Sequence, residues 1–318
     1  MAGTGSVDEI VRSELVREAP EAARRLAETL LDRYGDAVQA ILFYGSCLRR
    51  STSEGVLDFY MIVDDYRSTY GSGLLAAVNA LLPPNVFYLE QPGPGDTLRA
   101  KVAVLSARDF ARGTGPGSLR PGFWARFCQP VVAVHLRDEA ARDVVAESAV
   151  QAIHTAVTRG LGLVPSRDGA ACFSSRELWL AVFRETYASE LRTESDDSVT
   201  GLYAADPARY DRVLAAALAG LAADGRARIA RDGDAFRVSR ASQLLDRPRR
   251  GRRIAAKLIG AVQLVKSAFT FGDWVPYALW KLERHTGTRL ELTERQRRHP
   301  FLFAWPVFFR VLGRRELR

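Results

Sequence analysis

The residues best suited to chemistry are a glycine-serine pair and a carboxylate in the first quarter of the chain. An apolar run that ends at Tyr44 breaks at Gly45 and Ser46, and a second apolar run, residues 56–63, contains Asp58. Glycine lets backbone amides approach a phosphate closely, and the serine hydroxyl adds a hydrogen-bond donor. A carboxylate on the following strand can hold Mg²⁺ against the same phosphates. The pattern predicts a site for a phosphorylated ligand and a magnesium ion.

A structural turn is the competing interpretation, because glycine-serine pairs are common. An acid inside a strand that is otherwise fit for a core is costly to bury unless a cation or hydrogen bonds compensate, which favours a metal ligand at Asp58. The position two residues later shares its strand face and holds Tyr60, where a second acid is the usual pattern. Asp64 shares that face too, but six residues of strand place it roughly 20 Å away. A second ligand must come from elsewhere.

Two cations are expected beside this site. Arg99 and Lys101 lie two positions apart in the apolar run 98–106, so their side chains point to the same strand face. Unpaired buried charge is expensive, so two cations on one face of an inner strand favour a nearby triphosphate. The alternative is that both side chains are exposed at a sheet edge.

Further candidates are acids and a cation at other positions. Glu90 ends the run 86–90, on a strand that we expect beside the strand of Asp58. Because adjacent strands are about 4.8 Å apart, the Glu90 carboxylate is a candidate second metal ligand. The competing interpretation is a solvated strand end. Glu190 and Arg192, on a helix in the second half, are alternative site residues.

Composition limits the class of protein and of partner. The chain has 318 residues, 47% of them hydrophobic and 26% charged, which is ordinary for a globular protein that folds without staples. Its three cysteines are odd in number and widely spaced, which favours a reducing compartment over disulfides or a zinc motif. We expect neither a signal peptide nor a membrane span, and hence a cytoplasmic protein.

The charge is distributed unevenly. Residues 247–318 contain 17 Lys and Arg against 5 Asp and Glu, a net +12, and since the whole chain carries +8 the first 246 residues carry −4. A basic C-terminal part favours an anionic partner such as lipid headgroups, nucleic acid or a phosphorylated substrate.

The order of the elements predicts an α+β fold. We expect a small sheet flanked by helices in residues 1–160, a mainly helical part in 161–246, and a basic helical tail in 247–318. A helix followed by the hairpin 226–239 resembles a winged-helix unit. The elements expected in the first part are a helix over 8–34 broken near Pro20, strands at 38–44 and 56–63, a helix at 72–82, a hairpin of 86–90 with 98–106, a strand at 130–136, and a helix at 138–158.

The end of the chain combines aromatic residues with arginines. Residues 299–318 are too short to span a bilayer, but aromatic and apolar side chains beside arginines are typical of a segment that lies in the interface of an anionic membrane. Docking on the protein's own core is the alternative. Lys257, Lys266 and Arg310 are the candidate lipid or phosphate ligands of this basic region.

These motifs, taken in order, resemble the mitochondrial translocator assembly and maintenance family of CDP-diacylglycerol synthases. The family's Tyr-Gly-Ser, Leu-Asp-Phe, lysine-strand and Ser-Tyr-x-Gly-Asp-x-Arg motifs are similar to residues 44–46, 57–59, 100–106 and 186–192, and its basic C-terminal helix is similar to 257–269. The chain departs from the pattern at Glu90, Ser189 and Glu190, and it lacks the family's Trp-His element. The absence of a transit peptide favours a bacterial relative.

The resemblance implies a polymerase-beta-type nucleotidyltransferase core and a Mg²⁺-dependent phosphatidate cytidylyltransferase. Its substrates would be CTP and phosphatidic acid, and the protein would be peripheral to the inner face of a membrane. By this resemblance Asp58, Lys101 and Glu190 are catalytic, Asp58 and Glu90 hold the metal, and Tyr44, Gly45, Ser46, Arg99 and Arg192 bind the nucleotide. A nucleotidyltransferase acting on RNA or protein stays open, with nucleic acid the less favoured partner, and so does a non-catalytic relative that binds anionic membranes.

Overall fold

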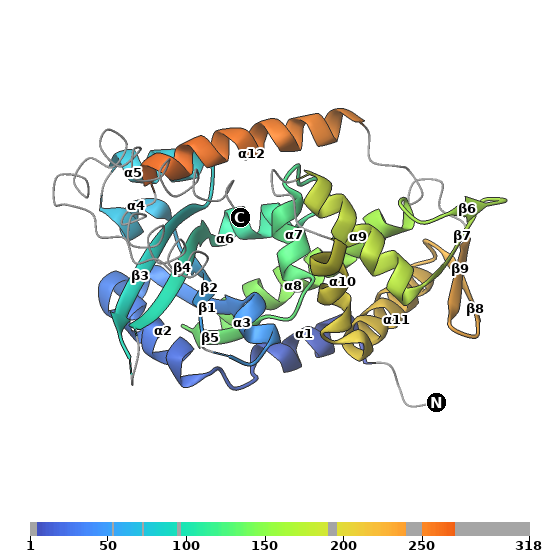
Figure 1. The fold of residues 1–318 in the computed structure, drawn as a ribbon, viewed down its shortest axis with the longest axis horizontal. Coiled ribbons are helices and arrows are strands. Elements are labelled where there is room, and N and C mark those ends of the chain that lie inside the picture. The colour runs from blue at the N-terminus through green and yellow to red at the C-terminus, as the bar shows by residue number, and fades with distance from the viewer. Residues whose placement is uncertain are drawn as a thin grey trace, which may run out of the picture.

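The computed structural model describes residues 5–52, 54–71, 73–93, 97–189, 196–239 and 250–270. The described chain is a mixed α/β structure in which two sheets are joined and covered by helices (Figure 1). Glu190, Arg192, Arg310 and the segment 299–318 lie outside the described residues.

A five-stranded mixed sheet forms the first part, in the order β3-β4-β2-β1-β5. Strand β2 pairs with β4 in parallel, and the other neighbours are antiparallel. The strands are β1 Val38–Tyr44, β2 Val56–Val63, β3 Asn85–Pro92, β4 Thr97–Ser106 and β5 Val132–Leu136. The inner strands are apolar on both faces because helices cover both.

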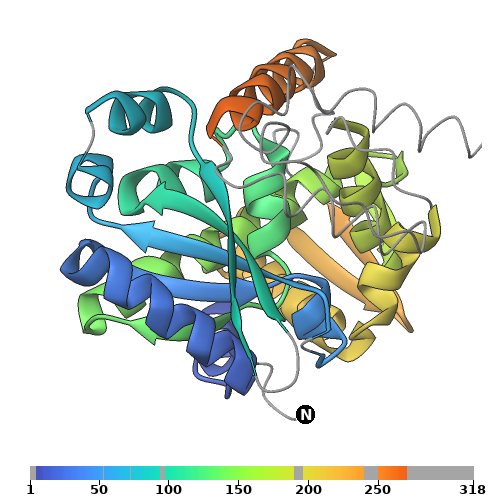
Figure 2. The same ribbon diagram turned by 60° about the vertical axis from the view of Figure 1, so that its left-hand side comes forward.

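The helices of the first part divide between the two faces of this sheet. Helix α2 (Glu21–Tyr34), together with α4 (Tyr66–Tyr70) and α5 (Gly73–Leu81), packs against the face that carries Phe43, Phe59 and Met61. The opposite face is covered by α1 (Val7–Leu15), α6 (Ala107–Thr114), α7 (Pro121–Phe127) and α8 (Glu139–Leu161). Figure 2 shows α2 in blue on one side of the sheet and the long green α8 on the other.

Local sequence signals set the helix ends. Ser6 and Glu9 form a capping box at the start of α1, and the Asp138 side chain caps α8. Pro20 is the N-cap of α2, so the helix expected over 8–34 is indeed broken there. A short 3-10 turn, Gly35–Ala37, leads into β1, and the four-residue helix α3 (Ser46–Arg49) follows that strand.

The second part is mainly helical and contains a small sheet. Its helices are α9 (Ser175–Ser189), α10 (Asp196–Ala204) and α11 (Pro207–Ala223). The expected hairpin is confirmed as β8 (Arg228–Asp232) and β9 (Ala235–Ser239), to which β7 (Ala170–Ser174) and β6 (Ser166–Arg167) add. The buried cluster around α8 continues without interruption into α9, α11 and β9, so both parts share one core.

Helix α12 (Arg250–Thr270) lies along one side of the molecule, beside α5 in both ribbon views (Figures 1 and 2). Its contact with the first part runs through polar side chains described below. Within the described segments, no helix combines the length and the apolar character needed to cross a bilayer.

Candidate functional site

The bend at Gly45 and the carboxylate of Asp58 lie in direct contact. Gly45 has φ +89° and is the N-cap of α3, at the point where β1 ends. A β-carbon at Gly45 would lie 2.6 Å from Oδ2 of Asp58, which is closer than real β-carbons approach an oxygen. Both the left-handed φ and this close approach require glycine. The acid and the bend that the sequence pairs are therefore adjacent in space.

Strand register places four polar side chains in one row across the sheet. Tyr44 of β1 is paired with Asp58 of β2, Asp58 with Lys101 of β4, and Lys101 with Tyr88 of β3. Paired residues on neighbouring strands project to the same face. The row therefore brings a carboxylate and an ammonium together at the end of the sheet next to the Gly45 bend.

Arg99 lies on the same face as Lys101, one row further along. Its side chain is only 17% exposed, and its Nε lies 3.3 Å from Oε1 of Glu90 on β3. Nη1 of Arg99 also donates to the Thr97 carbonyl at 3.0 Å. The two cations thus share a strand face as expected, and the alternative of two fully exposed edge side chains does not hold for Arg99.

The expected position of Glu90 is wrong. Strand β4 lies between β2 and β3, so Glu90 is two strands from Asp58, a spacing of roughly 10 Å. Glu90 instead accepts a hydrogen bond from the Tyr88 hydroxyl at 2.6 Å and pairs with Arg99. Its carboxylate serves to hold Arg99 and does not lie beside Asp58.

Tyr60 fills the position where a second acid would share the strand face. Its side chain is 3% exposed, and its ring lies 5.0 Å from that of Tyr44 and 4.8 Å from that of Phe127 on α7. An ionised acid at this position would be buried among aromatic rings, which is costly. The aromatic side chain of Tyr60 suits this position better than a metal-binding carboxylate would.

Helix α7 brings a further cation, Arg126, to the site. The pKa of Tyr44 is raised well above its usual value, first by burial and then by Tyr60 and Asp58, while Arg126 acts in the opposite direction. The Arg126 guanidinium is therefore within electrostatic reach of the same row, and its Nη1 also donates to the Gly122 carbonyl at 2.8 Å. No sequence signal marks Arg126 as a site residue, because α7 is too short to show a clear apolar period and was not expected.

Asp58 offers a single carboxylate to a metal ion. Among the residues the structure describes, no three His, Cys, Asp or Glu side chains form a metal-binding group. Mg²⁺ does not need such a cage, because it is bound by one or two carboxylates, waters and the phosphates of its substrate. A single carboxylate beside the Gly45 bend is compatible with a Mg²⁺ ion whose other ligands are waters and the phosphates of a substrate.

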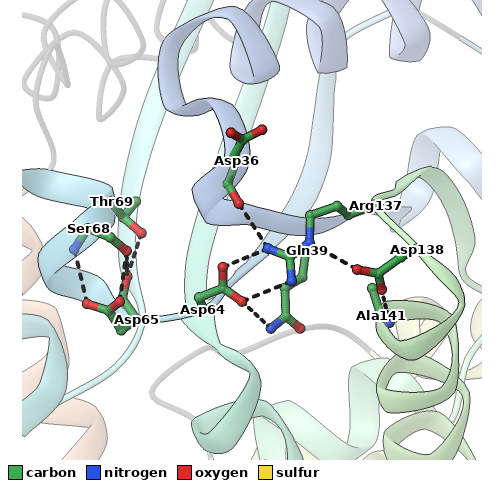
Figure 3. Close-up of polar contacts among 9 residues, drawn as sticks. All are labelled: Asp36, Gln39, Asp64, Asp65, Ser68, Thr69, Arg137, Asp138 and Ala141. Carbon is green, nitrogen blue, oxygen red and sulfur yellow. Dashed lines mark hydrogen bonds and ion pairs between the residues drawn. The ribbon is translucent and has the colours of Figure 1, made fainter.

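A second group of carboxylates lies at the other end of β2 and has structural partners (Figure 3). Asp64 accepts hydrogen bonds from Arg137 and Gln39, both at 2.6 Å, and the bond from Arg137 is the main reason why its pKa is lowered. Asp65 caps α4 through the Ser68 amide. Asp64 thus ties β2 to the segment after β5 and lies apart from Asp58, as expected.

The basic residues assigned to α12 fall into two environments. Lys257 is exposed, but Lys266 is only 9% exposed, contrary to its expected role as a headgroup ligand. Nζ of Lys266 donates to the carbonyls of Leu82 at 2.5 Å and Pro84 at 3.2 Å and to Oδ1 of Asn79 at 3.4 Å. Lys266 therefore fastens α12 to the end of α5.

Comparison of the sequence with protein-family models found no matching family, and comparison with curated proteins found no matching relative. The geometry of the site is therefore the basis for the function proposed below.

Proposed function

We propose that this chain is a Mg²⁺-dependent nucleotidyltransferase. The observation that carries the proposal is the contact between the Asp58 carboxylate and the Gly45 bend, where a β-carbon would lie 2.6 Å from Oδ2. Backbone amides at the start of α3 and the Ser46 hydroxyl would bind the triphosphate. Asp58 would hold Mg²⁺, whose charge neutralises the phosphates during transfer.

The cations around the row supply the remaining charge. Lys101 is paired in register with Asp58, and Arg126 reaches the row from α7, on the sheet face that Tyr44 and Tyr60 share. We assign Lys101 to the phosphates on the β4 side and Arg126 to those on the α7 side. Arg99 would add charge from the next row, where Glu90 holds it. Cations on two sides of an anion fix its orientation as well as its charge.

The acceptor we favour is phosphatidic acid, with CTP as the donor. An oxygen of the lipid phosphate attacks the α-phosphorus of CTP, the new P–O bond forms, and the bond to the β-phosphate oxygen breaks to release pyrophosphate. Both substrates are anions, in keeping with the net charge of +8 and with its concentration after residue 246. The protein would then work at the inner face of a membrane without crossing it.

Some finer parts of the fold belong to the same proposal. The mixed sheet with its Gly-Ser bend would be a polymerase-beta-type core, and α11 followed by the hairpin β8–β9 would be a winged-helix-like unit. The divisions at 160 and 246 would separate the core, this unit and the basic tail.

The test is an assay of the purified full chain with labelled CTP, Mg²⁺ and vesicles containing phosphatidic acid. The proposal predicts CDP-diacylglycerol and pyrophosphate, and loss of both products when Mg²⁺ is chelated. Parallel reactions with the other nucleotides, and with RNA or protein as acceptor, identify a nucleotidyltransferase of different specificity. No transfer with any donor and acceptor would contradict the enzymatic assignment and leave a binding protein.

A further inference from the structure

Large apolar side chains that face solvent are concentrated on two neighbouring helices. Within the described residues, six of the eight exposed large apolar side chains belong to α5 and α12. Leu74 and Leu81 of α5 are 76% and 86% exposed, and Leu258 of α12 is 63% exposed. The others on these helices are Leu75, Ile254 and Val262. Such a concentration marks an interaction surface, whereas scattered apolar side chains do not.

Contacts on one side of α12 fix its rotation about the helix axis, so that Ile254, Leu258 and Val262 face outward. Gln263 donates to the Pro84 carbonyl at 2.7 Å, Lys266 donates to the Leu82 carbonyl, and Ala256 is 7% exposed. These three residues define the inner side of the helix. Ile254 and Leu258, spaced four residues apart, line the outer side.

The two helices form one surface because they are joined at their ends. Lys266 binds Asn79 within α5 and the Leu82 carbonyl just beyond its end, so the C-terminal end of α12 lies against the C-terminal end of α5. Both ribbon views place α12 beside α5 (Figures 1 and 2).

The positive charge of α12 indicates an anionic partner for this surface. Helix α12 contains no acid. Of its five basic residues, Lys257 is exposed, Lys266 is turned inward to the carbonyls beyond α5, and the other three belong to the first four positions of the helix. Helix α5 contains no charged residue. Apolar side chains beside cations, on helices that lie along one side of the molecule, match an anionic bilayer, where the chains enter the interface and the cations meet lipid phosphates. We infer that the outer faces of α5 and α12 together bind an anionic lipid surface. The inference deepens the proposed function and rests on it only for the choice of phosphatidic acid.

The experiment is co-sedimentation of the full chain with vesicles of phosphatidylcholine, with and without phosphatidic acid. We expect binding to the anionic vesicles only. Leu81→Ser and Leu258→Ser should each lower the affinity on the order of tenfold, because each removes an exposed leucine side chain that the bilayer would bury. Val16→Ser is the matched control, since Val16 is 64% exposed but lies at the end of α1. It should bind vesicles as the unaltered chain does.

Several results would overturn the inference. Unaltered binding by both leucine variants, or no binding of the unaltered chain to anionic vesicles, would do so. A change from dimer to monomer in Leu81→Ser, with vesicle binding intact, would assign the surface to a second copy of the chain. Asp58→Ala should bind vesicles normally, so failure of nucleotide transfer and failure of the lipid surface are separate outcomes. Thermal unfolding of each variant confirms that it is folded.

Discussion

The side chain of Asp58 occupies the space that a β-carbon would need at Gly45. This contact explains why the bend is glycine. The backbone at Gly45, with φ +89° and ψ −159°, lies in a region that is essentially restricted to glycine. Loss of the glycine would therefore act on the acid as well as on the backbone.

Gly45→Ala should abolish nucleotide transfer, because the new methyl group displaces the Asp58 carboxylate from the bend. Gly35→Ala is the control: Gly35 also has positive φ, +54°, but no atom lies within 4 Å of the place that a β-carbon would take there. Both variants should lose about 1–3 kcal/mol of stability from backbone strain, measured by urea unfolding. Equal activity of the two would contradict a role for the contact.

Arg126→Ala should weaken nucleotide binding on the order of tenfold or more, because a charge-assisted contact to phosphate is lost. The measurement is a titration with CTP in the presence of Mg²⁺. Arg112→Ala provides the comparison, since the Arg112 side chain is 66% exposed and contacts Asp109 at 3.7 Å within its own helix. If both variants bind CTP like the unaltered chain, Arg126 has no part in the site.

At the level of the element, α12 is held by polar contacts to carbonyl groups at the end of α5. Lys266 donates to the carbonyls of Leu82 and Pro84, and Arg120 of the segment before α7 donates to the carbonyl of Pro83 and to Gln263. Burial, and secondarily the charge of Arg120, lowers the pKa of Lys266 to about 8. The docking of α12 therefore contributes a pH dependence to stability.

The sign of that dependence follows from the protons bound in each state. Between about pH 8 and the ordinary lysine pKa of 10.5, the unfolded chain keeps the Lys266 proton that the folded chain has lost. The free energy of unfolding should therefore rise with pH across that window. Below about pH 8 both states keep the proton, and Lys266 adds no pH dependence. Lys266→Met should remove the rise in urea unfolding measured from about pH 7.5 to 10. An unchanged slope would show that Lys266 titrates normally.

The strands were predictable from the sequence because β1 and β2 are continuous apolar runs, and their bounds agree with 38–44 and 56–63. The hairpin of β3 with β4 followed from alternating patterns on either side of a Gly-Pro loop. The strand order did not follow, because pairing β4 in parallel with β2 is a long-range choice that no local pattern specifies. That choice moved Glu90 away from Asp58.

The short helices were the other omission, and they had consequences for the site. Helices α4, α6 and α7 have only five, eight and seven residues, too few for a clear apolar period. Because α7 was missed, Arg126 and the aromatic cover over Tyr60 were missed with it. The burial of Lys266 was hidden for a related reason, since its acceptors are backbone carbonyls far away in the sequence.

At the level of the whole molecule, one buried ion pair fastens the helical part to the sheet part. Arg209 of α11 is 1% exposed, and its Nε and Nη2 donate to Glu14 of α1 at 2.6 and 2.9 Å. Its Nη1 donates to the carbonyl of Cys128, which directly follows α7. The pair therefore connects three helices, one of which carries Arg126.

Arg209→Met should destabilise the protein by about 3–5 kcal/mol, because it leaves the Glu14 carboxylate buried without its partner. Glu18→Ala, which breaks an exposed pair with Arg24, should cost no more than about 1 kcal/mol. Urea unfolding of both variants compares the two environments. A small effect at Arg209 would mean that the two parts are held together by apolar packing alone.

The sharpest test of the role of Asp58 compares Asp58→Asn with Asp64→Asn in the CTP transfer assay. The two changes are chemically identical and lie at opposite ends of β2, and Asp64 pairs with Arg137 far from the Gly45 bend. We expect that Asp58→Asn folds but neither transfers the nucleotide nor binds it more tightly with Mg²⁺, while Asp64→Asn retains both properties. Transfer by Asp58→Asn at the rate of the unaltered chain would show that this carboxylate holds no catalytic metal.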